Sequence, residues 1–179
     1  ELCVIRTLHT DIQQHSEATL AMHTGSPQFT LPGIGAWLSY GLGTFNRNLP
    51  GHVVLAKWNP YGGTKSWDNG FLPPQHQGVR IIPGDNPISN IESQARSVTL
   101  HQLQQKMLRD VNREHAQLRP HDFELAARTE SFATANGMMG AAPPLFDVSN
   151  ESASTLNMYG VGDDDNSSFG YQCLVARRL

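Results

Sequence analysis

Short apolar runs, separated by polar and glycine-rich stretches, mark the first ninety residues. We predict strands at 2–6, 53–57 and 78–82, and helices at 16–23 and 34–43. The first run is continuously apolar at its start, which is typical of a strand buried on both faces of a parallel sheet. A strand followed by helices and a second strand predicts the βαβ arrangement of a parallel sheet.

From residue 91 onward the apolar positions recur every three or four residues. This spacing predicts an amphipathic helix that ends before Pro120. Three more helices are expected: one capped by Asp122 and continuing to about residue 139, one capped by Ser149 and closed by Gly160, and one at 169–179 after a polar loop at 163–167.

The two patterns together predict an α/β fold with a mostly parallel sheet and a helical insertion. Residues 1–90 are expected to form a partial α/β core with the site loop, and residues 91–179 a helical region of the same domain. The chain opens at Glu1 without a methionine, and its last predicted helix reaches Leu179 without a capping signal. We therefore expect a fragment of a longer protein.

Charge and composition exclude several classes of function. Lysine and arginine total 13 against 16 aspartate and glutamate, a formal net charge of −3. Nucleic-acid binding is not expected, because it needs clustered basic residues. A membrane span is not expected either, because no apolar run approaches about 18 residues. Cys3 and Cys173 are interpreted as two buried thiols in preference to a disulfide.

Residues 59–74 are rich in glycine, proline and turn-forming residues, and aromatic residues are interleaved with them. Two interpretations remain open. Either the segment presents a binding surface lined by Trp58, Tyr61, Trp67 and Phe71, or it is a connector whose aromatic residues close the edge of the core.

Most of the eight histidines are predicted to be surface residues. His52 and His76 stand alone in loops or at strand starts, and His101, His115 and His121 lie on or beside the helical half. The acidic run at 163–165 lacks the spacing of a calcium loop and is interpreted as a solvated turn.

One segment combines several chemically competent side chains. His9, Asp11, His15 and Ser16 follow the first predicted strand and lead into a helix that Ser16 is expected to cap and that stops at Thr24-Gly25. Free amides at a helix N-terminus suit a phosphate or sulfate group, and imidazole and carboxylate groups suit divalent metals. Alternatively, His9 and Asp11 only bind loop amides.

This segment resembles the alkaline phosphatase and sulfatase superfamily, in which a strand leads to a nucleophile at the start of a helix that ends in Thr-Gly. Counting back from Thr24-Gly25 places Met22 at the position of a sulfatase leucine and His15 at the nucleophile. The sulfatase Pro-Ser-Arg is replaced by Glu17-Ala18-Thr19, and His15 stands where active members have cysteine, serine or threonine.

Nearly the whole chain resembles a bacterial sulfatase-like family catalogued as a domain of unknown function, number fifteen-oh-one. The matching stretches are residues 3–6, 9–11, 15, 22–25, 35–43, 48–51, 70–73, 156–160 and 173–179. The resemblance implies a partial alkaline-phosphatase-like α/β/α sandwich, export to the periplasm or beyond, and further metal ligands from segments before and after this piece.

The resemblance leads us to expect a metal-dependent hydrolase acting on a small anionic ester or a sulfated or phosphorylated glycan. His15 and Ser16 are the candidate catalytic residues, and His9, Asp11 and His15 are candidate ligands of a divalent metal, zinc or calcium. His15 would form a covalent adduct or bind the metal, or the nucleophile would shift to Ser16. The alternative is a non-catalytic exported binding or scaffold protein whose aromatic loop holds a glycan. The oligomeric state is left open.

Overall fold

The computed structural model describes residues 3–84, 86–92, 97–162 and 168–179. Its helices are α1 (His15–Thr24), α2 (Ile34–Leu42), α3 (Val98–Gln117), α4 (Phe123–Ala141), α5 (Pro143–Phe146), α6 (Ala153–Tyr159) and α7 (Phe169–Arg178). Two 3₁₀ helices, η1 (Gly63–Trp67) and η2 (Pro74–His76), lie between strands β1 (Val53–Leu55) and β2 (Val79–Ile81). The chain is therefore a mixed α/β structure in which helices predominate.

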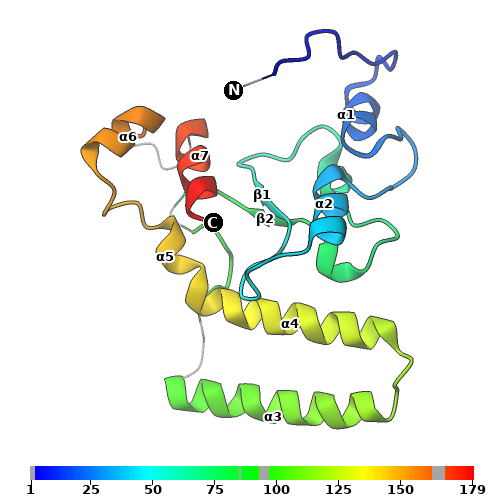
Figure 1. Ribbon diagram of the computed structural model, residues 1–179, viewed down its shortest axis with the longest axis vertical. Coiled ribbons are helices and arrows are strands. Elements are labelled where there is room, and N and C mark those ends of the chain that lie inside the picture. Colours follow the sequence, from blue (N-terminus) through cyan, green and yellow to red (C-terminus); the bar gives the residue numbers. More distant parts are fainter. Residues whose placement is uncertain (1–2, 85, 93–96, 163–167) are drawn as a thin grey trace.

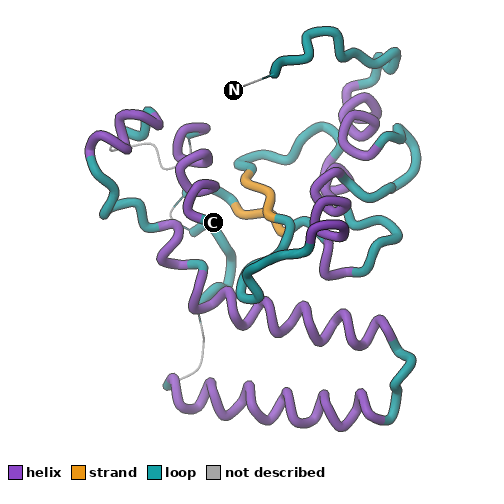
Figure 2. The backbone as a smooth tube through the Cα atoms, in the orientation of Figure 1, coloured by secondary structure: helices purple, strands orange, loops and turns teal. Residues whose placement is uncertain are grey.

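The two strands lie near the middle of the molecule, with α1 and α2 on one side of the view and α5, α6 and α7 on the other (Figures 1 and 2). They pair in parallel, with Val53 opposite Val79 and Leu55 opposite Ile81. Branched apolar residues suit such a pleated, partly buried surface. The strands predicted at 53–57 and 78–82 are confirmed over three residues each, and their parallel pairing agrees with the mostly parallel sheet expected from the sequence.

The strand predicted at 2–6 is wrong for residues 3–6, and residue 2 lies outside the described residues. Residues 3–6 form no strand, and Val4 and Ile5 are 66% and 65% exposed. A strand needs a neighbour to satisfy its backbone groups, and β1 and β2 pair only with each other within the described residues. Cys3, predicted to be buried, is exposed.

Side-chain caps set the starts of several helices. Ser97 accepts a hydrogen bond from the Leu100 amide at the start of α3, and Asp122 accepts one from the Leu125 amide at the start of α4. The Asp122 cap is thus confirmed. The cap of α6 is Ser152, not Ser149, while Gly160 closes that helix in the left-handed conformation as predicted. The predicted loop at 163–167 lies outside the described residues.

The buried core joins the sheet to the helical half. Leu49, Met138 and Ala142 form one buried cluster, against which Val79 and Phe146 pack. Tyr171, Leu174 and Val175 of α7 are also buried, at 3%, 0% and 1% exposure. The arrangement of residues 1–90 and 91–179 as two parts of one domain stays a prediction.

The solvent-accessible surface is larger than that of a compact protein of the same mass. The accessible surface is 12930 Å², whereas a compact protein of this mass exposes about 8,600 Å². Helix α3 runs beside α4 at the end of the molecule (Figure 1), and none of its residues is buried. Among the described residues, no helix combines the length and the apolar character that crossing a membrane requires.

Replacing Asp122 with alanine is expected to lower the free energy of unfolding by about 1 kcal/mol. The Asp122 carboxylate accepts the Leu125 amide at 2.9 Å, and alanine leaves that amide without its side-chain acceptor. Urea denaturation measures the change. Asp122→Asn is the matched control, because its amide oxygen still caps the helix, and an equal loss in both variants would contradict the capping role.

Candidate functional site

Helix α1 carries the residues that the sequence singles out. It begins at His15, and its N-cap is Gln14, whose side chain makes no capping hydrogen bond. The predicted cap at Ser16 is therefore wrong, because Ser16 is already inside the first turn. The predicted end is confirmed: Gly25 closes the helix at φ 82°. The Thr24 hydroxyl donates to the Leu20 carbonyl at 2.8 Å, which fixes this end.

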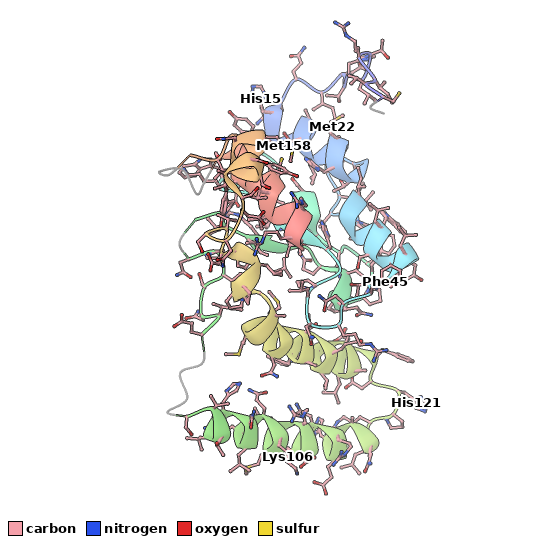
Figure 3. All side chains as sticks on the ribbon, turned by 60° about the vertical axis from the view of Figure 1, so that its left-hand side comes forward. His15, Met22, Phe45, Lys106, His121 and Met158 are labelled. Carbon is pink, nitrogen blue, oxygen red and sulfur yellow. The ribbon has the colours of Figure 1, made fainter. Side chains whose placement is uncertain are left out.

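The packing of α1 against η1 holds His15 at the surface. Leu20 is the buried residue of α1, at 6% exposure. A Cβ built on Gly62 would lie 3.3 Å from the Leu20 amide nitrogen, so glycine at this position allows the chain before η1 to approach α1 closely. His15 is exposed at the other end of the helix from Thr24 and is labelled in Figure 3.

An aromatic residue of the loop lies against His15. The ring of Tyr61 stacks on the imidazole, with centroids 5.1 Å apart and planes at 23°. Tyr61 is 75% exposed and Trp58 is 77% exposed, whereas Trp67 is buried at 7%. Trp67 thus closes the core, as the second interpretation expects, whereas Tyr61 and Trp58 face solvent and their role in a binding surface stays a prediction.

The candidate metal ligands do not assemble into a site. His9 Nε2 and Asp11 Oδ1 are 4.0 Å apart, and their side chains are 81% and 101% exposed. No group of three histidine, cysteine, aspartate or glutamate side chains within the described residues is placed to hold a metal ion. These residues alone therefore do not fit a zinc or calcium site.

Sequence reasoning missed a second cluster of polar side chains. Ser39 Oγ of α2 lies 2.9 Å from His76 Nδ1 of η2. His52 Nδ1 is buried without a hydrogen-bond partner. Burial lowers the pKa of both histidines. The prediction that His52 and His76 are isolated surface residues is wrong. The neighbouring Gly51 and Gly78 were the available signal, because small residues permit such close packing.

The serine–histidine pair does not form an accessible nucleophile. Ser39 is only 6% exposed, and a Cβ built on Gly51 would lie 2.7 Å from its Oγ. The chain at Gly51 therefore covers the hydroxyl. His101 is half-buried and its Nε2 lies 3.3 Å from Asn136 Oδ1, so it is not purely a surface residue either. His121 is exposed at the turn between α3 and α4 (Figure 3).

Comparison with known proteins confirms the family predicted from the sequence. The family described as "Protein of unknown function (DUF1501)" matches residues 1–179. No curated protein and no solved structure matches the chain. The wider relationship to sulfatases and alkaline phosphatases stays a prediction. Since the match spans all 179 residues, the chain belongs to the DUF1501 family of proteins of unknown function.

Proposed function

We propose that this chain supplies the anion-binding part of a sulfatase-like ester hydrolase and holds a sulfate or phosphate ester at the start of α1. The observation that carries the proposal is the position of His15, the exposed first residue of a helix whose N-cap side chain makes no cap. The first amides of a helix lack intrahelical acceptors and lie at the positive end of the helix dipole. They suit an anionic group.

His15 is assigned the role of contacting the ester, at the position where the superfamily resemblance places the nucleophile. Attack by its ring nitrogen on phosphorus or sulfur would form a bond to that atom and break its bond to the ester oxygen, which takes a proton from solvent and leaves as the alcohol. Water would then hydrolyse the covalent histidine adduct and restore the imidazole. Ser16 is the alternative nucleophile. Its hydroxyl accepts a hydrogen bond from Gln14 Nε2 at 3.4 Å, within the same turn as His15.

The proposal also includes the alkaline-phosphatase-like fold that the sequence resemblance implies. We infer that β1 and β2 are part of a larger parallel sheet of the alkaline-phosphatase-like sandwich, in an exported protein. The support for this inference is that β1 and β2 are three-residue strands paired in parallel, and a two-stranded sheet is marginal on its own in water. The resemblance to the superfamily implies that further ligands of a metal would come from segments before and after this piece.

A turnover assay on the full-length protein tests the proposal. We expect hydrolysis of 4-nitrophenyl sulfate or 4-nitrophenyl phosphate, with zinc or calcium added in separate samples, and competitive inhibition by inorganic phosphate. The absence of turnover with both esters, together with no phosphate binding by calorimetry, would overturn the proposal. Phosphate binding without turnover would favour the second candidate.

That second candidate is a non-catalytic protein that binds a sulfated or phosphorylated glycan, and the specific observation in its favour is the Tyr61 ring stacked on His15. An exposed aromatic face beside an anion-binding helix end suits a charged sugar. Replacing Tyr61 with alanine is expected to weaken binding of a sulfated oligosaccharide about fivefold, because aromatic contacts contribute about 1 kcal/mol. Calorimetry on the full chain measures the affinity.

Phe45→Ala is the matched control for Tyr61→Ala. Phe45 is fully exposed after α2 and lies apart from His15 in Figure 3, so its removal should leave glycan affinity unchanged. Equal losses in the two variants would show that binding does not depend on the Tyr61 surface.

A further inference from the structure

A cluster formed by His52, His76 and Ser39 links α2, η2 and β1, which are distant from one another in the sequence. His76 of η2 contacts Ser39 of α2 through Nδ1, and the ring of Tyr40 lies edge-on to the His76 ring at a centroid distance of 5.4 Å. His52 directly precedes β1, and its carbonyl accepts the Val79 amide of β2 at 2.9 Å. The two histidines therefore lie where α2 and η2 meet the parallel strands.

The His52 ring has little room to move. A Cβ built on Gly35 of α2 would overlap its Nε2, and a Cβ built on Gly78 would lie 2.9 Å from its Cε1. Its Nδ1 is enclosed without a hydrogen-bond partner. A proton added to Nδ1 would therefore place a positive charge in a confined site where this nitrogen has no hydrogen-bond partner, which costs free energy unless the packing opens.

His76 differs from His52 because it has a partner that tolerates either protonation state. A hydroxyl can donate to a neutral Nδ1 or accept from a protonated one, so Ser39 itself does not prevent charging. The charged or titratable groups that face His76 are Glu130 of α4, which favours the charged form, and Tyr40 of α2. The backbone of His76 favours the charged form of His52. Desolvation is the larger effect at both rings.

We propose that His52 and His76 form a proton-sensitive lock: as neutral rings they hold α2 and η2 against β1 and β2, and their protonation loosens this junction and opens Ser39 to solvent. Burial lowers the pKa of both groups below the usual value of 6.5. The unfolded or opened chain then binds more protons than the closed one as the pH falls below about 6.5, so acid favours opening.

The pH window separates this lock from ordinary acid denaturation. Hydrogen bonds from Lys106 and Ser149, respectively, lower the pKa of Asp110 and Asp147, so these carboxylates are stabilising when ionised. That stabilisation is lost only below about pH 4. A comparison between pH 7.5 and pH 5.5 therefore reports mainly on histidines.

The test is hydrogen exchange and urea denaturation of the full chain at these two pH values. We expect a lower urea midpoint at pH 5.5. The amides of α2 should exchange about tenfold faster than the intrinsic pH dependence of exchange accounts for, because their exchange follows the free energy of local opening. In the double variant H52Q/H76Q both changes should fall to less than half, because glutamine keeps polar atoms there without titrating. H121Q, at an exposed histidine, is the control and should behave as the wild type.

A second measurement does not depend on the variants folding. Nuclear magnetic resonance titration of the imidazole Cε1 protons in the wild-type chain should place the midpoints of His52 and His76 below the usual histidine value of 6.5. The proposal is overturned if both midpoints lie at or above that value, or if a folded H52Q/H76Q variant loses as much stability between pH 7.5 and pH 5.5 as the wild type.

Discussion

In the full-length protein, replacing His15 with alanine is expected to reduce kcat/KM for aryl sulfate or phosphate esters at least about a hundredfold, or ~2.7 kcal/mol of transition-state stabilisation. The imidazole is the proposed contact with the reacting centre, and alanine leaves only the helix amides to hold the anion. The fold should remain, because the His15 side chain is exposed and its ring stacks on Tyr61, which is itself 75% exposed.

His23 gives the matched control for that experiment. It is an exposed histidine in the last turn of the same helix, at the negative end of the dipole, where an anion is not stabilised. His23→Ala should retain turnover within about twofold, on the order of 0.4 kcal/mol. Equal activity of the His15 and His23 variants would show that His15 takes no part in the reaction. In that case, loss of turnover in Ser16→Ala would identify the Ser16 hydroxyl as the nucleophile.

Local sequence signals predicted the helices well, for a physical reason. The Asp122 cap, the glycine at the end of α1 and Gly160 at the end of α6 each act within one turn of the residues they close. A short window of sequence contains all the interacting groups. The start of α6 was missed because Ser149 and Ser152 are both good N-cap residues. Ser152 caps the helix, while the Ser149 amide donates to Asp147 Oδ1 in the preceding turn.

Non-local pairing explains the errors in the strands and in the site. The apolar run at 2–6 has strand character, but its pairing depends on a neighbour that the run does not specify. The contact between Ser39 and His76 joins residues 37 positions apart, and no periodicity in either segment indicates it. The stacking of Tyr61 on His15 is similarly a product of the packing of α1 against η1.

Replacing Leu174 with alanine is expected to lower the free energy of unfolding by about 2–5 kcal/mol. Leu174 is fully buried in α7, beside Tyr171 and Val175, which are also buried. Truncation removes apolar contacts and leaves a cavity that the neighbours fill only in part. Helix α7 is also bound to the α5 region through Arg178, which donates to the carbonyls of Leu145 and Pro144, so the backbone has little freedom to close the cavity.

Leu103→Ala is the control that distinguishes burial from the loss of a leucine side chain. Leu103 lies on α3, is 52% exposed and belongs to a helix without a buried residue. Its truncation should change stability by less than about 0.5 kcal/mol, since alanine also favours the helix. Urea denaturation of both variants measures the two changes in the free energy of unfolding. If Leu103→Ala lowers the free energy of unfolding as much as Leu174→Ala, the exposed face of α3 must be covered in solution. The accessible surface in excess of that of a compact protein would then mark an interface.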